Sequence, residues 1–284
     1  METIDVLMPI YDRPEFQQVT FEYINAARKP RKYKFWGFLD GGYSPKNKVM
    51  FEEMFLGNRE VILRPSKFGI NTNTPAALAW LGAKTKGEYV IQIQGDNVIS
   101  PDFFEFVDYT FRTFSPDIVC GDGVPSLPGI EELDKYKYVR ENKDFYTATG
   151  GCIKTTTLNK FIAPHFNQSY FNNHDAYAKE HFPGSLSSGS DFMIVAICRK
   201  HNLEVIRPLS TRCMHTGFHG CHCPMDKQFL DQWGGMSYKE RVVRIRKIVT
   251  DKSNPFTYNQ GNNIVTRFIN QDNNWDRLEL LGNK

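Results

Sequence analysis

The sequence predicts one α/β domain built on a mainly parallel sheet, and two observations support this prediction. Apolar strand-like runs alternate with segments of helical periodicity between residues 4 and 104. One of these runs, Tyr89 to Ile93, leads directly into a lone carboxylate, Asp96, and then into a turn. Open α/β sheets bind ligands at the carboxyl ends of their strands, so we expect Asp96 at a ligand-binding edge.

The predicted elements follow one another as strand, turn and helix. Strands are expected over residues 4–10, 34–39, 61–63 and 89–93, and helices over 14–27, 46–55 and 74–84. Pro75 is a suitable first residue for the third helix. Val98 and Ile99 continue the apolar pattern, and Pro101-Asp102 opens a further helix with Ser100 in the N-cap region.

The second half of the chain is richer in loops, which tend to bear binding groups. An apolar helix is expected from the segment 187–191 to Cys198, a last strand over 203–208 and a basic helix near 237–249. We place a loose boundary near residue 225. It separates an α/β domain, 1–225, from a C-terminal extension, 226–284, with the basic helix and an Asn-rich tail.

Bulk composition excludes several classes of protein. With 284 residues, 40% of them hydrophobic, the chain can bury a large core, and no run approaches the ~20 apolar residues of a membrane span. No signal peptide is recognisable, so a cytoplasmic location is expected. The net charge of +3 does not by itself indicate nucleic-acid binding, although basic residues cluster over 28–34 and 239–247. The six cysteines do not form a secreted disulfide pattern.

The strand-end segment Gln94-Gly95-Asp96-Asn97, followed by Ser100-Pro101-Asp102, resembles the acidic motif and helix start of GT-A fold, family 2-like nucleotide-sugar glycosyltransferases. The resemblance covers about residues 3 to 220 and rests on the order and spacing of several motifs. It implies a Rossmann-like GT-A fold and a hexosyl- or pentosyltransferase that uses a nucleotide diphosphate sugar, of the uridine type. The first of the two acids usual in the family is Gln94 here, which bears on metal dependence.

Asp96 and His215 are the metal-ligand candidates that the resemblance indicates. A bound Mn²⁺ or Mg²⁺ neutralises charge on a leaving diphosphate, and oxygen and imidazole ligands suit such ions. Each residue also has an ordinary structural interpretation. Asp96 lies in a Gly-Asp-Asn sequence typical of turns, and a lone histidine after a strand is often only a hydrogen-bonded residue.

The resemblance also implies a nucleotide-sugar site. Asp40 matches the residue that accepts a hydrogen bond from uracil N3–H, although an Asp-Gly turn is the alternative. Arg64 or Lys67 would meet phosphate, unless both are solvated surface charges. Glycines in the segment 149–152 would allow backbone to approach the donor sugar, or form a simple turn. The full set is Pro9, Tyr11, Asp12, Arg13, Asp40, Arg64, Lys67, Gly69, Gln94, Gly95, Gly150 and Gly151.

Asp191 is the candidate catalytic residue. Direct displacement with inversion needs a carboxylate beside the acceptor hydroxyl, and Asp191 matches the acidic residue that acts as this general base in the family. The acid that usually precedes it is Ser190 here. An aspartate at a helix start also stabilises the helix by about 1 kcal/mol, and one residue can do both.

The acceptor and a possible zinc site stay open at this stage. The segment 213–223 contains three cysteines and three histidines, which are zinc ligands, but its spacing is not that of a standard finger. We expect a saccharide or glycolipid acceptor, with the basic helix contacting an anionic membrane. The alternatives are a phage-type DNA glycosyltransferase acting on hydroxymethylated bases, and a non-catalytic protein that binds nucleotide sugar and zinc.

Overall fold

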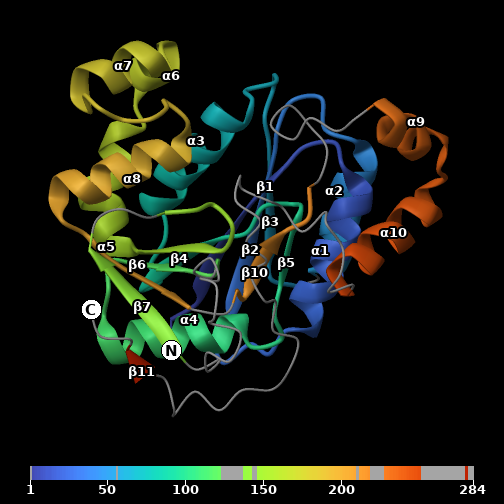
Figure 1. Ribbon diagram of the computed structural model, residues 1–284, viewed down its shortest axis with the longest axis horizontal. Helices are drawn as coiled ribbons and strands as arrows, with labels where there is room; N and C mark the ends of the chain where they lie inside the picture. The colour runs from blue at the N-terminus through green and yellow to red at the C-terminus, as the bar shows by residue number, and fades with distance from the viewer. Residues whose placement is uncertain are drawn as a thin grey trace.

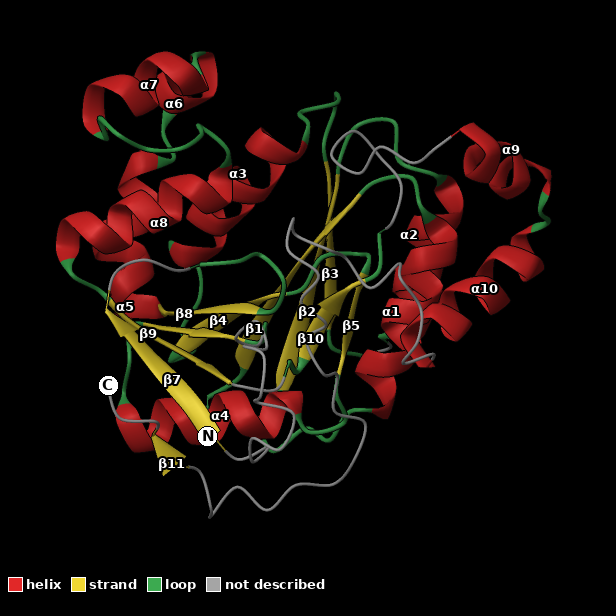
Figure 2. Ribbon diagram, in the orientation of Figure 1, coloured by secondary structure: helices red, strands yellow, loops and turns green. Residues whose placement is uncertain are grey.

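The computed structural model describes residues 2–55, 57–122, 137–142, 146–208, 211–217, 227–250 and 279–280. A nine-stranded sheet with the order β11-β7-β9-β6-β8-β4-β1-β2-β3 forms its centre. Helices lie on both sides of this sheet, with α3 and α8 on one side and α1 and α2 on the other (Figures 1 and 2). The predicted α/β fold class is confirmed.

The N-terminal half of the sheet is fully parallel and follows the predicted order. The strands are β1 (Ile4–Ile10), β2 (Tyr33–Leu39), β3 (Arg59–Leu63) and β4 (Tyr89–Gln92). The helices between them are α1 (Pro14–Ala26), α2 (Pro45–Met54) and α3 (Ile70–Gly82). Each strand therefore points its carboxyl end to the same edge of the sheet.

The other half of the sheet is mixed in direction. Strand β8 (Gly151–Lys154) runs antiparallel between β4 and β6 (Ile118–Cys120), and β9 (Glu204–Pro208) is parallel to β6. Beyond them lie β7 (Lys137–Asn142) and β11 (Glu279–Leu280). The helical segments of this half are α4 (Phe103–Phe114), α5 (Thr155–Thr157), two short turns over 158–165, α6 (Gln168–Asn172), α7 (His174–His181) and α8 (Ser190–His201).

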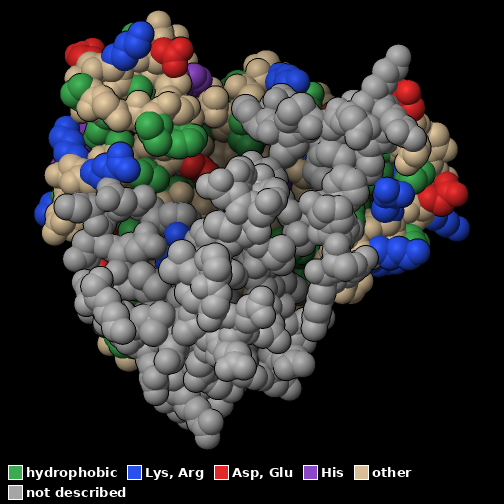
Figure 3. All heavy atoms as spheres, viewed as in Figure 1, with side chains coloured by type: hydrophobic (Ala, Val, Ile, Leu, Met, Phe, Trp, Pro, Cys, Tyr) green, Lys and Arg blue, Asp and Glu red, His purple; other side chains and the backbone are tan. Residues whose placement is uncertain are grey.

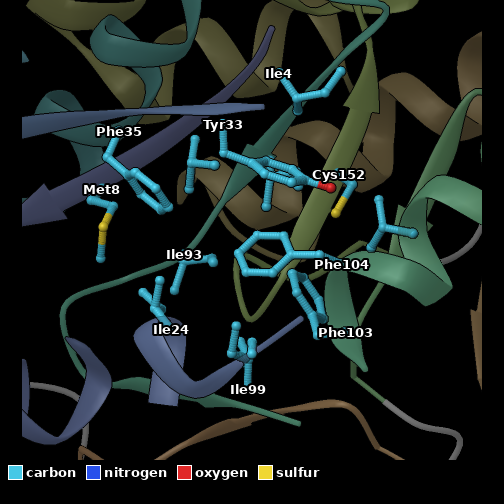
Figure 4. Packing of buried hydrophobic residues seen from close by; sticks show 14 of the residues in the cluster. Ile4, Met8, Ile24, Tyr33, Phe35, Ile93, Ile99, Phe103, Phe104 and Cys152 are labelled. Atoms are coloured by element: carbon cyan, nitrogen blue, oxygen red, sulfur yellow. The ribbon is translucent and has the colours of Figure 1, made fainter. Parts of the chain in front are cut away.

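Two hydrophobic layers hold the sheet between its helices. Alternate residues of β1, such as Val6 and Met8, face a cluster that includes Phe21 of α1 and Phe104 of α4 (Figure 4). Leu7, between them, faces the opposite layer, formed by α3, α8 and the segment 158–182. This alternation follows the two-residue period of a strand, and burial of both faces is typical of a central parallel strand.

Two predicted helix starts are wrong. Helix α3 begins at Ile70, which puts Pro75 inside the helix. A proline there cannot donate to the carbonyl of Asn71, and the hydroxyl of Tyr170 lies 3.4 Å from that oxygen and 3.0 Å from the Ser188 carbonyl. Helix α4 begins at Phe103 with Asp102, not Ser100, as its N-cap residue.

A smaller antiparallel pair, β5 (Asn97–Ile99) and β10 (Cys213–His215), lies beside the main sheet. Helices α9 (Lys227–Gly235) and α10 (Tyr238–Thr250) follow it, and α10 packs on α1. Their shared cluster contains Phe16, Val19, Val98, Met214, Trp233, Val242, Ile245 and Ile248. The predicted basic helix is confirmed, while the boundary near residue 225 stays a prediction. Among the described residues, no helix has the length and apolar character to span a membrane.

The Ile245→Ala variant tests the packing of α10 on α1. Ile245 is fully buried, so we expect the free energy of unfolding to fall by about 2–4 kcal/mol. The matched control is Val243→Ala on the same helix, where Val243 is 49% exposed and the change stays below about 0.7 kcal/mol. Urea unfolding followed by circular dichroism measures both. Equal effects of the two variants would show that α10 does not pack as described.

Candidate active site

Asp96 lies in a tight turn at the carboxyl end of β4. The amide of Asn97 donates to the Gln94 carbonyl, 3.0 Å away, and the Asn97 side-chain oxygen accepts from the Gln94 amide, also at 3.0 Å. These bonds close the turn and bury Asp96, of which 3% is exposed. The turn interpretation is therefore correct, and a turn at this edge of the sheet also suits a ligand-binding role.

The segment 211–217 brings His215 to Asp96 across more than a hundred residues of sequence. Strand β10 pairs with β5 so that His215 lies opposite Asn97, next to Asp96. Thr216 then donates its amide and its hydroxyl to the Asp96 backbone carbonyl, at 2.8 and 2.7 Å. Behind it, the fully buried Arg212 lies 3.8 Å from the carboxylate of Asp102. The predicted metal-ligand pair therefore meets in space.

The Asp96 carboxylate has two basic side chains at one oxygen. Its Oδ2 contacts the Arg13 guanidinium and lies 3.1 Å from His215 Nε2. Burial alone raises the pKa of this carboxyl, but Arg13 and His215 outweigh it and hold the pKa well below its usual range. The stability that this ionised group contributes is present above its unfolded pKa and is lost only when strong acid protonates the folded protein.

The Asp96–His215 pair fits a divalent cation. An octahedral Mg²⁺ binds its ligands at about 2.1 Å, so two neighbouring ligands lie about 3.0 Å apart, close to the spacing seen here. Within the described parts of the chain, no group of three or more histidine, cysteine or acidic side chains gathers around one point. Among the described residues, Asp96 and His215 are thus the two candidate ligands, a number that suits ions that also bind substrate phosphates and water.

Asp40 lies at the carboxyl end of β2 and organises the loop after β3. Its carboxylate accepts from the amides of Gly41, Phe68 and Gly69 at 2.9, 2.7 and 2.8 Å. A methyl group on Gly41 would overlap the backbone of Ser66, so the two loops need glycine there to pack. Three of about four acceptor positions of the carboxylate are occupied, which leaves one for a ligand. Base recognition by Asp40 stays a prediction.

Tyr11 and Lys67 meet beside these loops, whereas Arg64 is held slightly apart. The Lys67 ammonium lies 4.6 Å from the Tyr11 ring centroid, and its hydrogen bond to Tyr11 raises the lysine pKa. Arg64 donates to Asn73 at 3.0 Å and stacks between Phe38 and Phe68, each ring centroid 5.3 Å away. Its Nη2 is buried without a hydrogen-bond partner, which leaves one donor of the guanidinium unsatisfied.

The remaining candidates for nucleotide binding divide into close neighbours of Asp96 and packing residues. Gly95 lies against the Pro9 carbonyl, and its own carbonyl accepts from Thr20. Asp12 is exposed and acts electrostatically on Lys67. Gly150, with φ of +68°, packs on Cys213, and Gly151 packs on Tyr146. Gly150 therefore allows the backbone before β8 to lie close to β10.

Asp191 lies in the first turn of α8, as predicted. Its Oδ2 accepts from the Ala148 amide at 3.1 Å, and burial is the main cause that raises its pKa above the ordinary 3.8. The backbone of Ala148, the side chain of Ser190 and the charge of His215 partly offset this rise. His215 acts electrostatically on Asp191 and also lies beside Asp96, so its charge influences both carboxylates. A carboxylate with a raised pKa suits general-base chemistry.

The structure describes only residues 213–217 of the predicted zinc segment. Cys213 is fully buried in the larger hydrophobic cluster, and burial raises the pKa of its thiol far above normal. A buried protonated thiol is a poor zinc ligand. His219, Cys221, His222 and Cys223 lie outside the described residues.

Sequence reasoning missed the residues that hold the two ligands together. Arg212, Thr216 and Gly217 fix His215 over Asp96, yet none of the three is among the predicted site residues. The small Thr-Gly pair directly after His215 was the available signal, since small residues allow close approach of two backbones. Nor does the sequence indicate that Arg13 pairs with Asp96.

Comparisons with known proteins find similarity only in solved structures. No family model and no curated protein matches the chain. S. aureus TarS 1–349 is 10% identical with a TM-score of 0.49, and the match covers 87% of this chain and 72% of that one. The mannosyltransferase PcManGT from Pyrobaculum calidifontis, solved with GDP-Man and Mn²⁺, is 12% identical with a TM-score of 0.43, covering 62% and 52%. At these scores the matches do not bear on function, which we argue from this chain's own residues.

The Gly217→Ala variant tests the geometry around Asp96. An added methyl would lie 2.8 Å from Arg13 Nη1, 2.8 Å from His215 Cε1 and closer still to Asp96 Oδ2. We expect a loss of about 1–3 kcal/mol in the free energy of unfolding, since these groups must separate. Gly234→Ala is the control because nothing lies within 4 Å of its added methyl. Chemical denaturation compares them, and an unaffected Gly217→Ala variant would contradict the geometry.

Proposed function

We propose that the chain is a metal-dependent glycosyltransferase that moves a sugar from a nucleotide diphosphate sugar, of the uridine type, to an acceptor hydroxyl. The observation that carries this proposal is the convergence of Asp96 and His215, 3.1 Å apart at the carboxyl edge of the sheet. Asp191, in the first turn of α8, is under the electrostatic influence of the same histidine. A ligand pair for a divalent cation beside a buried carboxylate of raised pKa provides the two functions that sugar transfer needs.

The donor would lie along the carboxyl ends of β1, β2 and β4. Tyr11, Asp40 and the loop 66–69 border the nucleotide end, where one acceptor position of Asp40 is open to a base N–H. Asp96 and His215 would hold Mn²⁺ or Mg²⁺, which neutralises charge on the leaving diphosphate when bound. Lys67 and Arg64 add positive charge on the nucleotide side.

Asp191 would act as the general base. As the acceptor oxygen attacks the anomeric carbon, its proton passes to the Asp191 carboxylate and the bond from that carbon to the diphosphate oxygen breaks. The diphosphate leaves with the bonding electron pair, and because the acceptor oxygen attacks from the face opposite the diphosphate, the configuration at the anomeric carbon is inverted. The Ala148 amide, 3.1 Å from Oδ2, fixes the direction of the carboxylate during this step.

For the acceptor we propose a saccharide or glycolipid at an anionic surface. On α10, Arg241 and Arg246 pair with Glu15 and Glu22, while Lys239 and Lys247 line a shallow hollow with Val243 and Met236. In Figure 3, Lys and Arg side chains lie beside α10, with acidic side chains among them. Basic residues around an apolar one suit contact with anionic lipid. Transfer to hydroxymethylated DNA instead would identify the phage-type alternative.

The Asp191→Asn variant separates catalysis from folding. Asparagine keeps an oxygen for the Ala148 amide but cannot take a proton, so we expect sugar transfer to fall by about 10²-fold or more while donor binding stays near wild type. Transfer from a panel of nucleotide sugars and donor affinity are the two measurements. Wild-type transfer rates in this variant would remove Asp191 from the mechanism.

Stability against pH provides the control on the same variant. The folded pKa of Asp191 is raised, so its ionised form costs stability at pH 7. The variant should therefore be at least as stable as wild type at pH 7. The difference should shrink as the pH falls through the folded pKa toward 3.8, where Asp191 becomes protonated. A variant that is clearly less stable at pH 7 would indicate a structural role instead.

A further inference from the structure

Arg13 occupies the same carboxylate oxygen that the proposed metal site needs. Its guanidinium contacts Asp96 Oδ2, the atom that also lies 3.1 Å from His215 Nε2. Arg13 is the N-cap residue of α1, directly before Pro14, and its guanidinium lies 5.5 Å from the Phe16 ring centroid. The side chain is 35% exposed while that of Asp96 is 4% exposed. Arg13 thus reaches from the cleft surface down to a buried carboxylate.

The surroundings of Asp96 leave little space for a second cation. The backbone of Gly217 closes one side, since even an added methyl there would meet Asp96, Arg13 and His215. An ion that binds Asp96 Oδ2 must therefore displace Arg13 or share the oxygen with a positive charge close by. Both are costly, because like charges repel and a buried ion pair is broken.

A diphosphate would remove this cost. The guanidinium is planar and donates two parallel hydrogen bonds to phosphate oxygens, so a donor diphosphate offers Arg13 a partner as good as the carboxylate. Arg13 can then move from Asp96 to the diphosphate, which leaves the carboxylate to the metal ion while the guanidinium keeps a negatively charged partner. Metal and nucleotide would each raise the affinity of the protein for the other, as thermodynamic linkage requires.

We propose that Arg13 is a built-in counter-cation that occupies Asp96 in the nucleotide-free protein and suppresses metal binding until a donor diphosphate arrives. The inference rests on the proposed metal role of Asp96 and His215. It adds a positioning function for Arg13, whose contact holds the Asp96 carboxylate in place while no donor is bound. It also accounts for a single strand-end acid, because one carboxylate would alternate between two cations.

The test is direct binding of Mn²⁺, measured by electron paramagnetic resonance of the free ion, without nucleotide and with saturating UDP. Without UDP, Arg13→Gln should bind Mn²⁺ at least about tenfold more tightly than wild type, a gain of about 1.4 kcal/mol. The factor by which UDP raises Mn²⁺ affinity should be smaller in Arg13→Gln. The control is Arg246→Gln, which removes the same charge at an exposed pair with Glu22 and should match wild type.

The outcomes distinguish failure of the Arg13 inference from failure of the proposed metal site. If Asp96→Asn loses Mn²⁺ binding but Arg13→Gln binds no more tightly than wild type without UDP, the Arg13 inference is overturned and the metal site stands. If Asp96→Asn leaves Mn²⁺ affinity unchanged, the metal site itself is wrong. Should Arg13→Gln fail to fold, Arg13→Met removes the charge while keeping an apolar chain beside the Phe16 ring. Its nucleotide-free affinity for Mn²⁺ should exceed that of wild type, and an equal affinity would overturn the inference.

Discussion

The candidate site depends on one constraint, the attachment of the segment 211–217 to β5. Antiparallel pairing of β10 with β5 sets the register, and Thr216 bonds to the Asp96 carbonyl with both its amide and its hydroxyl. Arg212, buried beside Asp102 and over the Phe106 ring, anchors the same segment from behind. Truncating one member of a buried charged pair leaves the other uncompensated and is strongly destabilising. The position of His215, and with it any shared ligand of Asp96 and His215, follows from this attachment.

The carboxylates of the cleft differ because their neighbours differ. Asp96 is buried yet strongly acidic, since Arg13 and His215 favour its charged form, whereas burial dominates at Asp191 and raises its pKa. Asp40 is buried too, and backbone amides hold it. Asp96 thus suits binding of a cation, Asp191 suits uptake of a proton, and Asp40 organises a loop. Such divergence between neighbouring acids is what separates their chemical roles.

Much of the fold follows from sequence pattern, because strands β1 to β4 are apolar runs whose ends coincide with turns and helix starts. Asp96 could be predicted at the end of β4 for the same reason. The antiparallel insertion of β8 and the start of α3 could not, because both depend on tertiary partners such as Tyr170, which lies beside the Asn71 carbonyl that Pro75 leaves free. The Arg13–Asp96 contact joins residues 83 positions apart and has no local signature. The resemblance implies that Asp40 binds the nucleotide base. Its three amide partners could not be predicted, because they depend on how the loops pack.

The central claim is that Asp96, His215 and Asp191 line a cleft for a nucleotide-sugar donor and a divalent cation. The most direct measurement is calorimetric titration of the wild-type chain with UDP and with other nucleoside diphosphates, each in Mn²⁺ and again in chelator. The account predicts binding of one nucleotide in Mn²⁺ that weakens strongly in chelator, since metal and diphosphate share the site. No binding of any nucleotide, or binding that the chelator does not change, would contradict it.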